Sequence, residues 1–303
     1  MGTRYTAIFY GPAQLDVTAI GAALFGAVDE VDQQMSTWKP ASALSRLNGA
    51  PEHTWISVPA ALFEVLEAGL EVGRQSAGAF DIGVGELVEA WGFGPSHTRT
   101  AAPGAACAVA SFRPAWERLE LDRAGRQVRK NAPICLDLCG IAKGYGVDQL
   151  AHCLERWNIA DYLVGIDGEM RARGTKPAGE AWVVALEQPT VGVRAVGGVM
   201  ALGDVAIATS GDYRRCVTID GARYAHTIAP TEQQPLRNTL AAVSVLAPTC
   251  MLADAWATAL LVLGETAGLA LARNRSIDAL FTVRDGALLR EVLYLDGQLQ
   301  ALA

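Results

Sequence analysis

Two short segments of the chain carry side chains that could do chemistry. The first, Asp137–Asp148 (DLCGIAKGYGVD), places the turn Cys139-Gly140 just before the expected start of a helix, with Lys143 in the first helical turn. A helix start leaves backbone N–H groups unpaired and carries partial positive charge, so it can hold a phosphate or carboxylate, and Lys143 adds a full charge. The spacing is not that of a P-loop, and ordinary strand-to-helix turns use similar residues. The segment alone therefore leaves an anion site and a structural turn both open.

The second segment, Cys250–Gly264 (CMLADAWATALLVLG), predicts an apolar helix with two polar side chains on one face. Asp254 and Thr258 are four residues apart, about one helical turn, so they face the same way. A buried carboxylate must be paired, capped or bound to a metal, because an uncompensated buried charge is costly. One interpretation is a pair of hard oxygen ligands for Mg²⁺. The alternative is structural: Asp254 interacts with the helix N-terminus and Thr258 bonds back to a carbonyl.

The periodicity of apolar residues predicts the elements that must position these segments. We expect a first strand over Arg4–Tyr10, helices over Asp16–Gln34 and Val58–Gln75, and a strand over Ala132–Leu138 that leads to the Lys143 turn. Hairpins are expected about the turns Arg123–Gly125, Asp167-Gly168, Asp220-Gly221 and Asp285-Gly286. Because hairpins outnumber repeated strand–helix units, the predicted fold class is α+β, with mixed sheets flanked by helices in a single compact unit over residues 1–303.

The composition excludes several classes of protein. The 303 residues are 51% hydrophobic and 19% charged, which is typical of a globular chain. No charge-free apolar run reaches the roughly 20 residues that span a bilayer, so we expect no transmembrane segment. The net charge of −7, without a clustered basic face, argues against binding to nucleic acid.

The cysteines and the N-terminus bear on the compartment. The six cysteines form no CxxC pair and no zinc-binding spacing, which indicates free thiols in a reducing environment. The sequence as it stands shows no signal peptide or lipobox, so we expect a cytoplasmic protein. The alternative is a periplasmic protein whose leader has been removed.

Eight motifs, in order along nearly the whole chain, resemble the FAD:protein FMN transferase family, also called the ApbE family. They are MGTRY, MSTWKPASALSRLN, GAFDIGVGELVEAWGFG, LDLCGIAKGYGVD, IDGEMRARG, ATSGDYRR, YAHTIAP and MLADAWATALLVLG. The resemblance implies an ApbE-like fold and an enzyme that binds FAD and Mg²⁺. It further implies transfer of the FMN half of FAD onto a Thr or Ser hydroxyl of a flavin-accepting target protein, with release of AMP.

The motif positions also imply roles for individual residues. Gly140 would offer a backbone carbonyl to Mg²⁺, and Asp254 and Thr258 would offer side-chain oxygens. The residues implied for binding FAD are Met35, Trp38, Ala79, Phe80, Asp81, Lys143, Ser210, Gly211 and Ile228. A base near the acceptor hydroxyl would help the reaction, and His226 and Asp212 are the candidates. A lone histidine beside Thr227 can equally be a hydrogen-bonded structural residue.

The chain departs from the family pattern at three positions. Trp38 stands where the family usually has Tyr, Cys139 where it has Gly, and Ala229 where it has Asp, so that one carboxylate is missing. Two alternative functions stay open. The protein could hydrolyse FAD to FMN and AMP, with water in place of the acceptor hydroxyl, or it could bind FAD without turnover.

Overall fold

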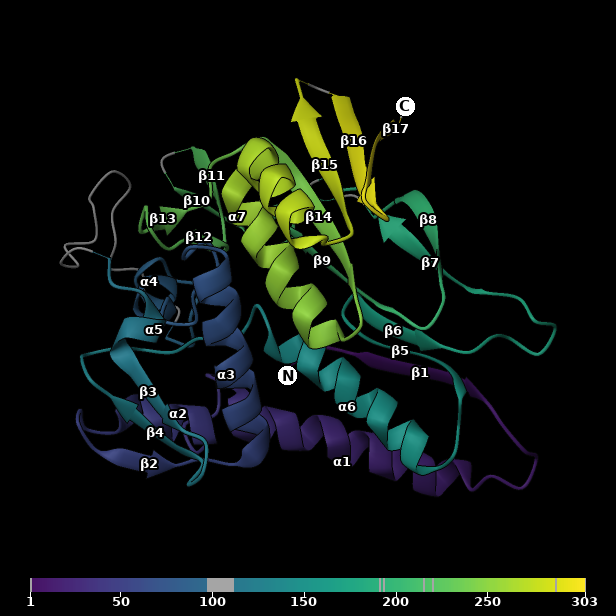
Figure 1. Cartoon of the computed structure of the whole chain (residues 1–303), viewed down its shortest axis with the longest axis horizontal. Helices are drawn as coiled ribbons and strands as arrows, with labels where there is room; N and C mark the ends of the chain where they lie inside the picture. Colours follow the sequence, from purple (N-terminus) through teal and green to yellow (C-terminus); the bar gives the residue numbers. More distant parts are fainter. Residues whose placement is uncertain are drawn as a thin grey trace.

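An eight-stranded antiparallel sheet runs through the computed structural model (Figure 1). The structure describes residues 2–96, 112–190, 192, 194–214, 216–219, 221–286 and 288–302. From one edge to the other, the strands are β1 (Tyr5–Tyr10), β5 (Asp161–Ile166), β6 (Glu169–Arg173), β9 (Ala206–Gly211), β14 (Leu240–Ala247), β15 (Ala279–Asp285), β16 (Leu288–Leu295) and β17 (Gln298–Leu302). The expected first strand and the hairpins about Asp167-Gly168 and Asp285-Gly286 are confirmed.

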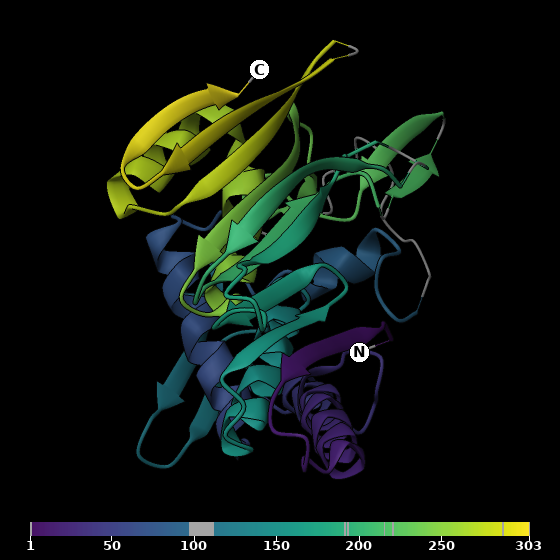
Figure 2. The same ribbon diagram turned by 90° about the vertical axis from the view of Figure 1, so that its right-hand side faces the viewer.

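Helices cover one face of this sheet and a β-ribbon covers part of the other (Figure 1). Helix α7 (Cys250–Arg275) packs on β9 and β14, α6 (Ala142–Arg156) packs on β5 and β6, and α1 (Val17–Met35) packs on α6. The ribbon consists of β7 (Trp182–Glu187) and β8 (Val196–Leu202), and Figure 2 views the molecule from its side. These layers confirm the predicted α+β class.

The remaining helices and strands are mostly short. The helices are α2 (Ala43–Gly49), α3 (Ala60–Gln75), α4 (Gly85–Ala90) and α5 (Ala115–Arg118). The strands are β2 (Trp55–Ser57), β3 (Leu119–Asp122), β4 (Gln127–Lys130), β10 (Cys216–Ile219), β11 (Ala222–Ala225), β12 (Ile228–Ala229) and β13 (Gln234–Pro235). The β3–β4 hairpin about Arg123–Gly125 is confirmed. Strands β10 and β11 pair as expected, although Asp220 in their turn lies outside the described residues.

The predicted strand over Ala132–Leu138 is wrong. Its backbone groups bond to loops and to a side chain instead of to a neighbouring strand. The N–H of Asp137 donates to the Ile82 carbonyl at 2.8 Å, and the Asn48 side chain bonds both the N–H and the carbonyl of Leu136. The segment is apolar because it is buried, and it needs no strand partner because these bonds satisfy its polar groups.

Helix α7 begins at the expected residue but continues past the predicted end. Gly264 interrupts it with a φ of 76°, after which helical structure resumes to Arg275. Within the described residues, α7 is the one helix long and apolar enough to cross a membrane by length and composition, and half of its most apolar stretch is buried inside the protein. Its contacts with β9 and β14 make it the central core helix of this fold.

Candidate functional site

A cavity of about 700 Å³ collects most of the predicted site residues. Its walls come from the end of α1, the loop ahead of α4, the start of α6, the β5–β6 turn, the end of β9 and the first half of α7. The predicted residues that line it are Met35, Trp38, Ala79, Phe80, Asp81, Gly140, Lys143, Ser210, Gly211, His226, Ile228, Asp254 and Thr258. Residues spread over more than 200 positions of sequence thus face one space, and Asp212 is the predicted residue that does not.

The centre of the site is a close contact between α6 and α7. The N–H of Gly144 donates to Asp254 Oδ2 at 3.0 Å, so the first turn of α6 holds the Asp254 carboxylate. A Cβ atom at Gly144 would lie 2.2 Å from the Cys250 carbonyl oxygen, and only glycine allows this approach. Asp148 accepts from the N–H groups of Cys250 and Met251 at 3.0 and 2.9 Å and fixes the start of α7. The anion bound at the α6 start within the chain is therefore Asp254 itself.

Lys143 and Glu169 form an ion pair beside Asp254. Glu169 is only 3% exposed, and its Oε2 is buried without a hydrogen-bond partner in the described structure. Burial raises the pKa of Glu169 to about 7, with Lys143 opposing the shift. Burial by itself would lower the pKa of Lys143, but the charges of Glu169 and Asp254 raise it overall. Burial also raises the pKa of Asp254. Two buried carboxylates thus lie beside one ammonium group.

The three predicted metal ligands lie together at this end of the cavity. Asp254 and Thr258 lie one turn apart on α7, and a Cβ at Gly140 would lie 3.2 Å from Thr258 Oγ1. The hydroxyls of Thr258 and Ser210 are 2.9 Å apart. A carboxylate, a hydroxyl and a backbone carbonyl are hard oxygen donors of the kind that Mg²⁺ prefers. No group of three or more His, Cys, Asp or Glu residues that could hold a metal occurs in the described ranges, so any metal here would need this mixed set.

The charges around the cavity are unbalanced. Seven carboxylates line it, at Asp32, Asp81, Asp137, Asp167, Glu169, Glu187 and Asp254, against three cations at Lys39, Lys143 and Arg214. Each cation pairs with a carboxylate of the lining, namely Asp32, Glu169 and Glu187 respectively. An anionic ligand such as a pyrophosphate would meet surplus negative charge, which a bound divalent cation would offset. The residues present therefore fit a hard divalent cation.

Aromatic and apolar side chains form the other part of the lining. Met35 and Phe80 are buried, whereas Trp38 is 48% exposed at the cavity. His226 is half-buried, and its ring meets that of Phe93 edge-on with centroids 6.4 Å apart. An indole exposed at an acidic cavity suits stacking on a planar ring better than covering a core edge.

The two remaining predicted carboxylates are engaged by the protein. Asp81 lines the cavity, but its oxygens accept from the N–H groups of Gly83 and Ala115 at 2.6 and 2.9 Å, so the carboxylate shapes its own loop. Asp212 does not line the cavity, and the Arg284 guanidinium donates hydrogen bonds to both of its carboxylate oxygens at 2.7 and 2.8 Å. A carboxylate held in this way is poorly placed to accept a proton from a ligand in the cavity, which leaves His226 as the candidate base.

Some residues of the site have no role implied by the sequence motifs. The main one is Glu169. The sequence feature that could have identified it is a carboxylate at the start of a strand, directly after the Asp167-Gly168 turn. Two others are Arg214 and Glu187. Their ion pair connects the end of β9 to the end of β7, and the hydroxyl of the neighbouring Tyr213 donates to the same carboxylate at 3.2 Å. Nothing in the local sequence pairs these distant residues.

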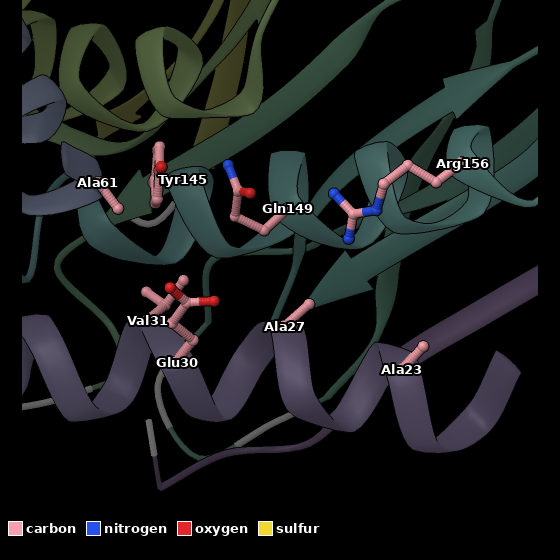
Figure 3. Close-up of a pocket in the computed structure, with 8 residues that line it drawn as sticks. All are labelled: Ala23, Ala27, Glu30, Val31, Ala61, Tyr145, Gln149 and Arg156. Carbon is pink, nitrogen blue, oxygen red and sulfur yellow. The ribbon is translucent and has the colours of Figure 1, made fainter. Parts of the chain in front are cut away.

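A smaller cavity of about 300 Å³ lies between α1 and α6. Figure 3 shows Glu30 of α1 and Tyr145, Gln149 and Arg156 of α6 on either side of it. None of the predicted site residues lines this crevice. The larger cavity is therefore the candidate site.

Comparison with known proteins gives a consistent result. The ApbE family model matches residues 1–281. The FAD:protein FMN transferase of Klebsiella pneumoniae (strain 342) is 35% identical over 290 residues, which cover 94% of this chain and 83% of that protein. The FAD:protein FMN transferase of Vibrio cholerae serotype O1 is 36% identical over 291 residues, 94% of this chain and 85% of that protein.

Solved structures agree with these sequence matches. The flavin transferase ApbE from Vibrio cholerae has a TM-score of 0.88 and 35% identity, with coverage of 98% of this chain and 95% of that one. The apo form of the Pseudomonas stutzeri flavinyl transferase ApbE has a TM-score of 0.87 and 33% identity, with coverage of 98% and 92%.

Proposed function

The chain belongs to the ApbE family, and from this premise we propose that it is an FAD:protein FMN transferase that moves the FMN half of FAD to a Thr or Ser hydroxyl of a target protein and releases AMP. The observation that carries the proposal is the convergence of Gly140, Asp254 and Thr258 with the Lys143–Glu169 pair in one acidic cavity. An exposed Trp38 and a half-buried His226 complete the features that a planar, phosphate-linked substrate requires.

The reaction is a phosphoryl-type transfer in which positioning and charge matter most. The acceptor hydroxyl oxygen attacks the phosphorus of the FMN half, and the bond from that phosphorus to the bridging oxygen breaks. The bridging oxygen leaves with AMP, and the hydroxyl proton passes to a base. His226 lines the cavity and is the side chain we assign to this proton transfer. Lys143 pairs with Glu169 and lines the same cavity, which supports a role for it in balancing charge on the phosphates.

We further propose that Mg²⁺ is held by the Gly140 carbonyl, the Asp254 carboxylate and the Thr258 hydroxyl. When bound, the ion supplies charge neutralisation and orientation for the pyrophosphate. Support comes from the hard oxygen donors and from the surplus of carboxylates around the cavity. The chain's own part is to keep Asp254 in place, through the Gly144 N–H and through the capping of α7 by Asp148.

The test is incubation of the protein with FAD and Mg²⁺, with and without a flavin-accepting domain that carries a candidate threonine. AMP release and covalent flavin fluorescence on a denaturing gel are measured. We expect both products with the wild-type chain, and we expect Asp254→Asn to lower the rate at least about a hundredfold, as for loss of an electrostatic element of an active site. Asp212→Asn is the matched control, because that carboxylate lies outside the cavity, and it should retain the transfer.

Three outcomes would redirect the proposal. AMP without covalent flavin on any acceptor would favour the FAD pyrophosphatase alternative. Tight FAD binding without AMP would favour a flavin-binding protein without turnover. Equal loss in Asp254→Asn and Asp212→Asn would contradict the assignment of the cavity as the reaction site.

A further inference from the structure

The β7–β8 ribbon has two unlike faces. Trp182, Val184 and Leu202 are buried against the large sheet, in one apolar cluster with residues of β6 and β9. The opposite face presents Val183, Val199 and Val196 to solvent, with 51%, 70% and 66% of their surface exposed. Apolar side chains on the exposed face of a two-stranded ribbon do nothing for the core and carry a risk of aggregation. Their presence calls for another explanation.

Strand register shows that the exposed side chains form one continuous surface. Residues directly opposite each other in an antiparallel pair lie on the same face. Val183 pairs with Ala201, Ala185 pairs with Val199, and, across an irregularity in the register, Glu187 pairs with Val196. Val183, Ala185, Val196, Val199 and Ala201 are therefore neighbours on the outside of the ribbon, with Glu187 at the end of the same face that meets the cavity. We call the five apolar residues the outer ribbon face. Its small and β-branched side chains make it flat and apolar.

The outer ribbon face adjoins the wall of the candidate site. Ala185, Leu186 and Glu187 line the large cavity, so Val199 lies across the ribbon from a residue of the cavity wall. The ribbon is also fastened there, because Glu187 accepts from the Tyr213 hydroxyl at 3.2 Å and from Arg214 Nε at 3.0 Å. Arg214 in turn donates to the Asp167 carbonyl at 2.9 Å. The exposed apolar face is thus held in a fixed position at the cavity wall.

We propose that the outer ribbon face is the docking surface for the flavin-accepting protein. The inference rests on the proposed function, because a transferase whose second substrate is a folded protein must bring that protein's hydroxyl to the cavity. The surface around the acceptor residue then lies against whatever adjoins the cavity, and the outer ribbon face is continuous with its wall. The fitting partner has a flat apolar patch, of strand-like or small side chains, beside its acceptor hydroxyl. Apolar contact of this kind is the main source of affinity at the centre of protein interfaces.

The test separates docking from chemistry by placing a charge on the ribbon. Val199→Lys and, independently, Val196→Lys are compared with Leu288→Lys, which alters an equally exposed residue (73%) of the β15–β16 hairpin that does not line the cavity. The probes are FAD with a soluble flavin-accepting domain, and FAD with a short synthetic peptide that spans the acceptor threonine of that domain. We expect kcat/KM for the domain to fall at least about tenfold in both ribbon variants and to stay within about twofold in Leu288→Lys. KM for FAD should not change.

The peptide makes the result interpretable, because it can enter the cavity without covering the ribbon. Unchanged kcat/KM for the peptide, with a loss for the domain, supports the docking surface. Equal rates of domain modification in wild-type, Val199→Lys and Val196→Lys overturn it. A wild-type chain that modifies neither substrate contradicts the proposed function itself, which distinguishes the two failures. If sedimentation shows that the wild-type chain is a dimer and that Val199→Lys is a monomer, the face belongs to a second copy of the chain, and the proposal is likewise overturned.

Discussion

Substituting Gly144 by alanine tests whether the site depends on backbone contact between α6 and α7. Helix propensity alone predicts that alanine stabilises the helix, by about 1 kcal/mol relative to glycine. Packing predicts instead that alanine at this position destabilises the protein. The new Cβ would lie 2.2 Å from the carbonyl oxygen and 2.6 Å from the carbonyl carbon of Cys250, and 2.8 Å from the Met251 Cα. These are backbone atoms, so no rotamer change relieves the clash, and α6 and α7 must separate by about 1 Å to reach ordinary contact.

The expected size of the effect follows from these opposing terms. Overpacking a core typically costs about 1–3 kcal/mol and occasionally more, and here the clash is with backbone. Because backbone atoms cannot move aside, we take the upper end of that range, about 3 kcal/mol. The propensity gain of about 1 kcal/mol then leaves an expected net loss of about 2 kcal/mol of unfolding free energy. The separation also moves the Gly144 N–H away from Asp254 Oδ2, now at 3.0 Å. The proposed metal site predicts that added Mg²⁺ stabilises the folded protein, and this stabilisation should shrink in Gly144→Ala.

Gly21 provides a matched control in another helix. It lies in α1, and a Cβ there would meet nothing within 4 Å. Gly21→Ala should stabilise the protein by about 0.5–1 kcal/mol, through helix propensity and reduced freedom of the unfolded chain. Urea unfolding of both variants, with and without Mg²⁺, measures the two free energies. If Gly144→Ala is as stable as wild type and responds equally to Mg²⁺, the proposed contact between the helices is wrong.

Two further predictions concern a buried carboxyl group and a helix break. Because burial raises the pKa of Glu169 from its ordinary 4.5 to about 7, the stability that this group contributes is complete below about pH 4.5 and is lost as pH rises through 7. The unfolding free energy of the metal-free protein should therefore fall from about pH 5 to pH 8 more steeply in wild type than in Glu169→Gln, and equal slopes in denaturant titrations would refute this. Gly264→Ala forces a side chain into a backbone conformation with φ of 76° and ψ of 179°, which glycine alone adopts easily, and should cost roughly 1–3 kcal/mol. A thermal melt unchanged from wild type would mean that α7 does not break at this residue.

Local patterns in the sequence predicted the parts of the fold that local forces decide. The four-residue spacing of Asp254 and Thr258 put both on one face of α7 because a helix repeats every 3.6 residues. Turn residues such as Asp167-Gly168 marked hairpins correctly because both have positive φ there. The strand predicted over Ala132–Leu138 was wrong, because a strand requires a hydrogen-bonded partner and the sequence of one segment does not show whether a partner exists. In the structure, hydrogen bonds to loops and to the Asn48 side chain take the place of a partner strand.

The parts of the site that the sequence did not predict are pairings between distant residues. Lys143 of α6 and Glu169 of β6 are 26 positions apart in the sequence. Their side chains meet only because α6 packs on β6 in the folded protein. Asp212 directly follows Ser210 and Gly211, which line the cavity, yet its side chain points toward Arg284 of β15. Asp212 follows the last residue of β9, so the strand no longer fixes the direction of its side chain, and adjacency in a motif does not place that side chain in the site.

Burial bears on residue 229, where the resemblance to the family predicts an aspartate and this chain has alanine. Ala229 lies on β12, where it pairs with Gln234 of β13 and is almost fully buried. Its neighbours Ile228 and Pro230 line the cavity, whereas Ala229 does not. A carboxylate at this buried position would lie in a desolvated environment and would need its own partner, whereas alanine needs none. The features that a catalyst needs and a carrier does not, Asp254 against the start of α6 and Lys143 held by Glu169, are unaffected by this substitution.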